Sequence, residues 1–425
     1  MVASISLRSH AFDYRFDPWC LTESPILFCP INYREFTYHY RVNGEPQNRV
    51  ALIAAKTPPD GRMRMKKGAN VLSEIGVGLI GFGLAGRSFH APVIRAVPGL
   101  RLVAILQRSG LEAAEMYPDV RIVRSVEELL SIDGIRLIVI ATPNETHAPL
   151  AKKCLASGRD VIVDKPFATS YQEAAELVQF AKECGRLVTV YQNRRFDGDF
   201  QALQQLVRSG TLGRIVRFET NYDRFRPKLK ANAWREKVAP GAGILFDIGP
   251  HLIDHAMLLF GRPAAITADV RIEREGGLAD DAFDITFHHP DGIRAVLSSN
   301  ILAATQRPRF LLFGTEGAFL KQTFDPQENN LRRGEIPKDT PWGLEPEENW
   351  GLLTLSDGIT FTQRRIPSAL CDYRDYYANI RDVLFGKAEP FVTTQQALNV
   401  MRALELVRES SASHCTIPWS EVKKE

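Results

Sequence analysis

Cysteine is scarce in this sequence, which has six in 425 residues. They are widely scattered, and no two of them form a Cys-x-x-Cys pair. A small disulfide-stapled domain and a structural zinc site both need closely spaced cysteines, so we expect neither a disulfide framework nor a metal site. The positions are Cys20, Cys29, Cys154, Cys184, Cys371 and Cys415.

An excess of charge of one sign is also missing, because 53 Lys and Arg residues nearly balance 50 Asp and Glu residues. The resulting net charge of +3 is too small to predict binding to nucleic acid or to an anionic membrane. The chain has no run of roughly 20 apolar residues and no basic stretch followed by an apolar core at its N-terminus. We therefore expect a cytoplasmic protein that acts on a small molecule.

What the sequence does contain is a glycine-rich turn between an apolar strand and a helix. Residues Ile75–Gly86 read IGVGLIGFGLAG, and Arg87–Ala96 follow with helical spacing. In a Gly-x-Gly-x-x-Gly turn the first glycine permits the turn, the second admits a pyrophosphate, and the third lets helix and strand pack closely. The pattern predicts dinucleotide binding at the start of the helix. The turn residues expected to contact the cofactor are Gly81, Phe82, Gly83, Leu84 and Gly86.

Short apolar strands alternate with helical segments over residues 71–193. Strands that are almost wholly apolar and alternate strictly with helices are typical of a parallel sheet covered on both faces, so we predict a doubly wound α/β domain of the Rossmann type. The expected strands are Ile75–Ile80, Leu100–Leu106, Arg121–Val123, Ile135–Ala141, Asp160–Val163 and Leu187–Tyr191. The expected helices are Arg87–Ala96, Leu111–Tyr117, Val126–Leu130, Thr146–Ala156 and Tyr171–Glu183.

Strands predominate after residue 193, several of them joined by hairpin-like turns such as Pro290-Asp291-Gly292. This predicts an α+β domain over residues 194–425 with a large, open, mostly antiparallel sheet, closed by helices at Tyr373–Phe385 and Gln395–Glu409. Residues 1–70 mix aromatic residues, Pro and Arg without a sustained period. We expect an irregular N-terminal extension there, with the biological start near Met65.

The residues after the second strand indicate which dinucleotide is bound. An NAD enzyme usually carries an acid at this point for the ribose hydroxyls, but the sequence here is Gln107-Arg108-Ser109. Arg108 as a charge partner and Ser109 as a small donor suit the 2′-phosphate of NADP. We therefore expect NADP, with NAD as the alternative, and an Arg108 that stacks on the adenine or is merely solvated as the other interpretation.

Polar residues also follow the fourth and fifth strands, where ligands bind in an open α/β sheet. They are Thr142, Pro143, Asn144 and His147 after the fourth strand, and Asp164 and Lys165 after the fifth. We expect all of them near the cofactor, although the Thr-Pro-Asn stretch can equally be a capped helix start. Partial desolvation of Lys165 beside the nicotinamide would bring its pKa toward the working range of an acid/base catalyst.

Asp247 and His251 lie four residues apart in a helical stretch of the second domain. On one helix face, the carboxylate can orient the imidazole and stabilise its charge, which makes the pair a proton-transfer unit. The alternative is a helix cap together with a structural histidine. Arg195, Tyr222 and Arg226 are further candidates to contact substrate hydroxyls or a carboxylate.

The order of these motifs resembles the Gfo/Idh/MocA family of oxidoreductases. A glycine turn is followed by Thr-Pro-Asn, then Asp-Lys-Pro, then Asp-x-x-x-His before a sheet-rich domain, from about Ile75 to the C-terminus. The stretches Tyr191–Phe200, Asn221–Pro227 and Leu245–Asp254 are similar to members of the NADP-dependent scyllo-inositol dehydrogenase type. Asp164 stands where the family most often has Glu, and the shorter side chain puts that contact in question.

The resemblance implies roles for individual positions. Lys165 corresponds to the family's catalytic lysine, and Asp247 and His251 correspond to its substrate-binding and proton-transfer pair. The implied cofactor contacts are the glycine turn, Thr142, Asn144, Asp164, Asn193, Trp234 and Arg235. The open sheet of the family commonly forms dimer or tetramer interfaces, so we expect a homodimer or homotetramer.

Together these features predict an NADP-dependent dehydrogenase/reductase that acts on a secondary alcohol of a polyol or sugar, inositol-like in character. Either His251, tuned by Asp247, or Lys165 can be the base, and the sequence leaves both open. Two other functions remain as alternatives. One is a redox-neutral NAD-dependent glycosidase that keeps its cofactor bound, and the other is a cofactor-sensing protein without turnover.

Overall fold

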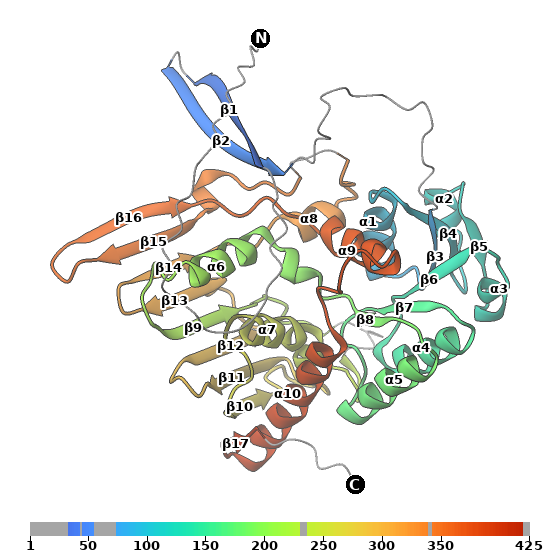
Figure 1. Ribbon diagram of the computed structural model, residues 1–425. Helices are drawn as coiled ribbons and strands as arrows, with labels where there is room; N and C mark the ends of the chain where they lie inside the picture. The colour runs from blue at the N-terminus through green and yellow to red at the C-terminus, as the bar shows by residue number, and fades with distance from the viewer. Residues whose placement is uncertain (1–32, 43–44, 55–73, 230–235, 339–341, 420–425) are drawn as a thin grey trace, which may run out of the picture. The chain divides into compact units, whose positions relative to one another are not determined.

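The structure, a computed structural model, describes residues 33–42, 45–54, 74–229, 236–338 and 342–419. The chain separates into two compact units, Met1–Val71 and Leu72–Glu425. In the first unit, strands β1 (Tyr33–Val42) and β2 (Glu45–Ala54) pair antiparallel along their full length (Figure 1).

This strand pair differs from the irregular extension predicted for residues 1–70. Phe36, Tyr38 and Tyr40 alternate with polar residues, a period of two that is typical of a strand. The sequence between the two strands is Asn43-Gly44, and Asn-Gly is the strongest short-range signal for a two-residue hairpin. The aromatic and Pro-rich surroundings hide this local pattern when the segment is judged as a whole.

The first part of the second unit is a six-stranded parallel sheet in the order β5-β4-β3-β6-β7-β8. Its strands are β3 (Ile75–Ile80), β4 (Leu100–Leu106), β5 (Arg121–Val123), β6 (Ile135–Ile140), β7 (Asp160–Val163) and β8 (Val188–Val190). Every residue of β3, β7 and β8 is buried, which explains their apolar sequences. The predicted Rossmann domain is confirmed, and its strand order reverses between β3 and β6.

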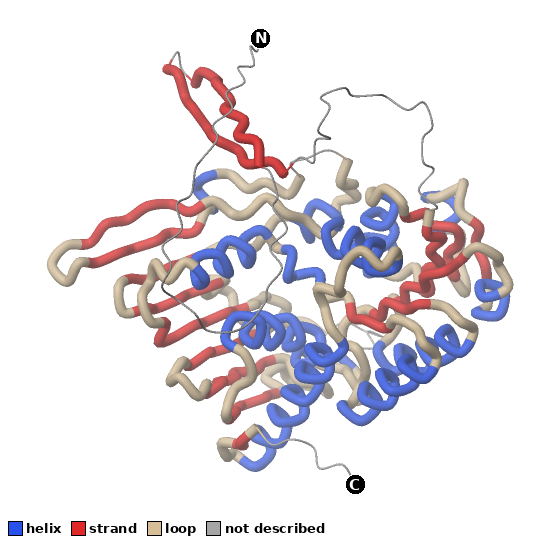
Figure 2. The backbone as a smooth tube through the Cα atoms, viewed as in Figure 1, coloured by secondary structure: helices blue, strands red, loops and turns tan. Residues whose placement is uncertain are grey.

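Helices connect the strands of this sheet and cover it (Figure 2). They are α1 (Ala91–Arg95), α2 (Glu112–Met116), α3 (Val126–Leu130), α4 (His147–Ala156) and α5 (Tyr171–Glu183). A π-helical turn, Ala85–His90, precedes α1 without a break, so the helix that follows the glycine turn runs over 85–95. The predicted positions of these helices are confirmed to within a few residues at each end.

The second part of the unit is built on a nine-stranded sheet in the order β16-β15-β14-β13-β9-β12-β11-β10-β17. Neighbouring strands are antiparallel except β9 and β12, which run parallel, so the predicted open and mostly antiparallel sheet is confirmed. Its strands are β9 (Ile215–Asn221), β10 (Ala265–Arg271), β11 (Ala282–His288), β12 (Arg294–Asn300), β13 (Phe310–Gly314), β14 (Gly317–Lys321), β15 (Gly351–Ser356), β16 (Phe361–Ile366) and β17 (Ile417–Pro418).

Helices α7 (Ile244–Phe260) and α10 (Thr394–Ser413) lie against one face of the large sheet (Figure 1). Helix α7 contacts β11 and β12, while α10 contacts β10. The α10 helix also packs against α5 and β8, so it holds the two sheets together. Helix α6 (Gly198–Arg208) packs against α7, and α9 (Arg374–Leu384) packs against α1. No helix in the described ranges is both long and apolar enough to cross a lipid bilayer.

Helix α8 (Gln327–Arg332) was not predicted from the sequence, where its surroundings resemble a long polar excursion. Tertiary contacts hold it in place. The Gln327 side chain donates to the main-chain oxygen of Phe196 at 2.9 Å and accepts from the main-chain nitrogen of Tyr373 at 3.0 Å. A six-residue helix is marginal without such contacts, so its own sequence pattern is too short to reveal it.

Candidate active site

A cavity of about 1060 Å³ is lined by residues from both parts of the second unit. Its walls include the segments that follow β3, β4, β6 and β7, together with α7, α8 and the segment after β9. The volume lies just above the roughly 300–1,000 Å³ that is usual for small-molecule sites, so it can hold a cofactor together with a substrate. The cavity therefore lies where a doubly wound sheet binds ligands, beyond the carboxyl ends of its strands.

The three glycines of the turn after β3 serve three different purposes. Gly81 has a φ of +98°, which only glycine adopts readily, and a Cβ there would lie 2.4 Å from the oxygen of Ala141. A Cβ on Gly86 would lie 2.0 Å from the oxygen of Gly81, so the third glycine permits close packing. A Cβ on Gly83 would meet no atom within 4 Å, and Gly83 borders the cavity. The turn thus offers the open cradle that a pyrophosphate needs.

Arg108 and Ser109 are exposed at the rim of the same cavity. The main chain around them is fixed, because the Arg124 guanidinium donates to the oxygens of Gln107 at 2.7 Å and Gly110 at 3.0 Å. The Gln107 side chain is engaged by the carboxylate of Glu112. Within the described part of the chain, Arg108 itself forms no ion pair, so its guanidinium is available to a ligand at the rim.

The segment after β6 divides into residues that reach the cavity and one that supports them. Thr142, Pro143 and Asn144 line the cavity, and the Asn144 amide donates to the oxygen of Gly241 at 2.7 Å. His147 is completely buried and does not line it. Its ring nitrogens lie 3.0 Å from the oxygen of Thr142 and 2.8 Å from the oxygen of Pro166. The histidine therefore connects two cavity loops. It does not contact the cavity, although the sequence had led us to expect a cofactor contact.

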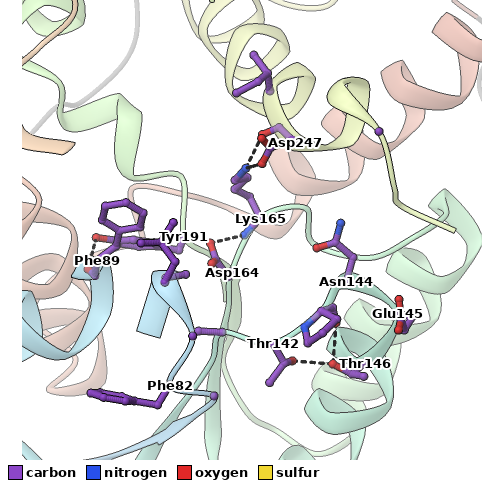
Figure 3. A pocket seen from close by; sticks show the side chains of 18 of the residues that line it. Phe82, Phe89, Thr142, Asn144, Glu145, Thr146, Asp164, Lys165, Tyr191 and Asp247 are labelled. Atoms are coloured by element: carbon purple, nitrogen blue, oxygen red, sulfur yellow. Dashed lines mark hydrogen bonds and ion pairs between the residues drawn. The ribbon is translucent and has the colours of Figure 1, made fainter. Parts of the chain in front are cut away.

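Lys165 and Asp247 both line the cavity, and the Lys165 side chain points at Asp247 (Figure 3). The Lys165 ammonium donates to the main-chain oxygen of Asp247 and lies 3.2 Å from its Oδ1. The Arg224 guanidinium lies 3.1 Å from the other carboxylate oxygen. Both Lys165 and Asp247 side chains are more than four-fifths shielded from solvent. The carboxylate therefore joins two cations, one from each part of the unit, and stabilises their charged forms.

Asp164, next to Lys165, is held by a buried histidine. Its Oδ1 accepts from the main-chain nitrogen of Lys165 at 2.8 Å, and its Oδ2 lies 3.6 Å from Nε2 of His90. Burial on its own raises the pKa of the Asp164 carboxyl, but the His90 imidazole and the Lys165 ammonium hold it below its usual range. Nδ1 of His90 in turn lies 2.6 Å from the Tyr377 hydroxyl. Although Asp164 is shorter than the Glu that is usual at this position in the family, its carboxylate is held in a defined position by these contacts.

His251 lines the cavity on the same helix face as Asp247, but the Asp247 carboxylate does not orient its imidazole through Nδ1 as we had predicted. Nδ1 of His251 is buried and has no partner among the described residues. Burial lowers the pKa of His251 well below its usual value, and the nearby charges of Lys165 and Arg194 lower it further. The carboxylate binds Lys165 and Arg224 instead, because their charges attract it more strongly than a neutral imidazole does.

Arg195 does not reach the cavity, contrary to our expectation of a substrate contact. It is buried, and its guanidinium forms a bidentate pair with Asp254 at 2.6 and 2.7 Å. It also donates to the oxygen of Phe391 at 2.7 Å and to the Gln396 side chain at 3.0 Å. Four of its five N–H donors are thus directed at protein groups, so Arg195 is a structural residue.

Tyr222 is likewise buried and absent from the cavity wall, although we expected it to contact substrate. Its hydroxyl accepts from Arg194 at 3.0 Å and donates to Glu328 at 3.1 Å. The Arg224 guanidinium lies over its ring, 4.8 Å from the centroid. Tyr222 therefore holds Arg194, Glu328 and Arg224 in position without lining the cavity itself.

The cavity contains residues that the sequence did not reveal. Arg194, Arg224, Glu328 and Arg332 all line it. Burial on its own raises the pKa of the Glu328 carboxyl, but Arg194 and Arg332 together lower it to about 2. Arg194 and Arg195 are adjacent and alike in sequence, and Glu328 belongs to the unpredicted α8, so no local signal distinguishes these residues.

Two of the expected cofactor contacts, Trp234 and Arg235, lie outside the described residues. Asn193, at the start of the 3₁₀ helix Asn193–Phe196, does line the cavity, as do Phe82 and Leu84 of the glycine turn. Among the residues that the structure describes, no group of His, Cys, Asp or Glu side chains is placed to hold a metal ion.

Comparisons with known proteins cover nearly the whole second unit. The oxidoreductase family with an NAD-binding Rossmann fold matches residues 75–192, and the GFO/IDH/MocA C-terminal domain matches residues 200–320. The chain is 39% identical over 343 residues to the oxidoreductase YdgJ of Escherichia coli, covering 81% of this chain and 98% of that protein.

Two further similarities come from Bacillus subtilis. The scyllo-inositol 2-dehydrogenase (NADP(+)) IolW is 33% identical over 351 residues, which cover 83% of this chain and 98% of that protein. The solved structure of the oxidoreductase yvaA superposes with a TM-score of 0.79 at 33% identity, over 82% of this chain and 99% of that one.

Proposed function

We propose a specific activity for this chain, which belongs to the Gfo/Idh/MocA family of oxidoreductases. It is an NADP-dependent dehydrogenase/reductase that interconverts a secondary alcohol and a ketone on a polyol or sugar. The observation that carries the proposal is the placement of an open glycine turn and the Lys165–Asp247 pair on the walls of one cavity. The glycine turn supplies a cradle for a dinucleotide, and the Lys165–Asp247 pair supplies a proton carrier on the wall of the same cavity.

NADP is proposed over NAD because of the residues after β4. Arg108 is exposed at the rim and pairs with no acid among the described residues, Ser109 follows it, and no acid occupies the position that would exclude a 2′-phosphate. The relative IolW is named as an NADP(+) enzyme, which agrees with this choice. The glycine turn, which is open to the cavity at Gly83, would hold the pyrophosphate. The bound nicotinamide would supply the hydride donor or acceptor.

Lys165 is proposed as the residue that carries the proton. Asp247 stabilises its ammonium, which can donate a proton to the carbonyl oxygen when a ketone is reduced. In the oxidising direction the neutral amine takes the hydroxyl proton as the carbon gives up its hydride. His251 lacks the carboxylate partner that would strengthen it as a base, because Asp247 is engaged by Lys165 and Arg224. The neutral imidazole is instead placed to orient the substrate hydroxyl.

This proposal can be tested by measuring cofactor binding and turnover with the full chain. NADPH and NADH are titrated by fluorescence, and inositols, aldoses and their keto forms are then screened by absorbance at the nicotinamide band. We expect NADPH to bind more tightly than NADH, and at least one polyol or keto-sugar to change the absorbance. Tight binding without any absorbance change would favour a redox-neutral or sensing role, and failure to bind either nucleotide would contradict the assignment of the glycine turn.

A further inference from the structure

Four arginines gather at the Lys165 end of the cavity, and we call them the arginine cluster. They are Arg194, Arg224, Arg226 and Arg332, and all four line the cavity wall. Most of them have an acidic partner. Arg194 and Arg332 bind Glu328, and Arg224 binds Asp247. Arg226 is the exception, because it forms no ion pair with any residue that the structure describes.

The backbone places Arg224 and Arg226 on the same side of an extended segment. The main-chain nitrogen of Arg224 donates to the oxygen of Asn300 at 3.0 Å, and that of Arg226 donates to the oxygen of Ile301 at 2.7 Å. Alternate residues of an extended chain point in the same direction. Both guanidinium groups are therefore directed at the cavity by a segment that is anchored to the end of β12.

Like charges surround the unpaired guanidinium. Burial lowers the pKa of Arg226, and the charges of Arg224 and Arg332 lower it further, while Asp247 acts in the opposite direction. The two carboxylates that pair with the cluster are already engaged, Asp247 by Lys165 and Arg224 and Glu328 by Arg194 and Arg332. An added anion would gain a charge-assisted bond to Arg226 and would also be attracted by the charges of Arg224 and Arg332.

We infer that the substrate carries an anionic group, a carboxylate or a phosphate, which the arginine cluster binds next to the reacting hydroxyl. Asp247 contacts both Lys165 and Arg224, so the anion site and the proton carrier lie on either side of one carboxylate. The charge on the substrate is therefore only a few bonds from the carbon that reacts. A polyhydroxy acid or a sugar phosphate has this arrangement, whereas an uncharged inositol does not. This inference rests on the proposed function.

The test uses the NADPH-loaded full chain and its Arg226→Gln variant at constant ionic strength. D-Gluconate, D-glucuronate and D-glucose 6-phosphate serve as anionic probes, and D-glucose and scyllo-inositol as neutral ones, with the fluorescence of bound NADPH as the readout. We expect at least one anion to bind tighter than both neutral probes, and Arg226→Gln to weaken it roughly tenfold or more. Comparing the carboxylates with the phosphate then identifies which anion the site prefers.

Arg333→Gln is the matched control, because it removes the same charge one residue after Arg332 but does not line the cavity. It should leave the affinity for the anions unchanged. The Kd for NADPH should stay unchanged in both variants, which separates the substrate anion from the phosphates of the nucleotide. Neutral probes that bind as well as the anions would overturn the inference, as would equal losses in both variants or no binding of any anion. Failure of the proposed function would appear separately, as loss of NADPH binding in the unsubstituted chain.

Discussion

Lys165 and Asp247 are 82 residues apart in the chain, yet the Lys165 ammonium lies 3.2 Å from Oδ1 of Asp247 and also donates to its main-chain oxygen. One residue follows β7 of the parallel sheet, and the other lies in the first turn of α7. Both contacts require the two sheets to keep a fixed position relative to each other, and α10 packs against elements of both. The Lys165–Asp247 pair therefore forms only when the two parts of the second unit pack together, and the local sequence of either part does not predict it.

Replacing Lys165 with Met should remove most of the turnover. A positioned acid/base group contributes about 10²- to 10⁴-fold to a rate, and Met keeps the length of the side chain without its proton. We expect kcat to fall by about that factor while the Kd for NADPH, measured by fluorescence, changes little. Lys152→Met is the control, since Lys152 lies outside the cavity wall and is paired with Glu176. Near-normal turnover in Lys165→Met would rule out the assigned role.

The glycine turn allows a paired test of folding against binding. Gly83→Ala adds a methyl group to open space in the cavity, so we expect normal stability but weaker binding of NADPH. Gly86→Ala drives its Cβ toward the oxygen of Gly81, so we expect a loss of stability of about 1–3 kcal/mol. Urea unfolding and NADPH titration of both variants separate the two effects. Equal behaviour of the two variants in both assays would contradict the geometry.

Arg108→Ala should reduce the preference for NADPH. A charge-assisted contact between a guanidinium and a phosphate contributes about 1.5–3 kcal/mol, which corresponds to roughly tenfold to a hundredfold in affinity. The Kd for NADPH should rise by that factor and the Kd for NADH should not change. Arg101→Ala provides the comparison, because Arg101 is equally charged and exposed but does not line the cavity. An equal loss of affinity for both nucleotides would assign Arg108 to the adenine instead.

Tyr377→Phe should destabilise the fold through His90. The Tyr377 hydroxyl lies 2.6 Å from Nδ1 of His90, which is completely buried, and its removal leaves that nitrogen unpaired. Leaving a buried polar group without its partner costs about 1–3 kcal/mol in the free energy of unfolding, which urea titration can measure. Tyr171→Phe is the matched control, because the Tyr171 hydroxyl has no partner in the described part of the chain. Equal stability of the two variants would show that the His90 contact is not needed.

Stability should decrease as the pH falls from about 7 to about 6. Burial lowers the pKa values of His147, His251 and His255, so these side chains stay neutral in the folded protein. In the unfolded chain they take up protons below about pH 6.5, and each can reduce the free energy of unfolding by up to about 1.4 kcal/mol per pH unit.

A carboxyl group opposes this trend at lower pH. Burial raises the pKa of Asp197 to about 6. The folded protein therefore binds a proton there before the unfolded chain does, and the loss of stability should become less steep below about pH 6. Urea unfolding at a series of pH values measures both parts of the curve. A constant free energy of unfolding between about pH 7 and pH 6 would contradict the neutral histidines.

The amino-acid sequence by itself determined the local parts of this protein. Runs of apolar residues fixed the strands of the parallel sheet, because strands buried on both faces admit few polar side chains. The glycine pattern fixed the turn after β3, since Gly81 and Gly86 occupy positions where any Cβ would meet a backbone oxygen. The motif after β7 likewise placed Lys165 at the cavity.

Only the tertiary structure decided which side chains meet. Arg194 and Arg195 are adjacent and chemically identical, but one lines the cavity and the other pairs with the buried Asp254. Asp247 shares a helix face with His251, yet its carboxylate binds Lys165, which approaches from another sheet. Glu328 reaches the cavity from α8, a helix too short to be predicted from its sequence pattern. Periodicity records which face of an element is buried, whereas pairing of charges depends on distances across elements that local sequence does not contain.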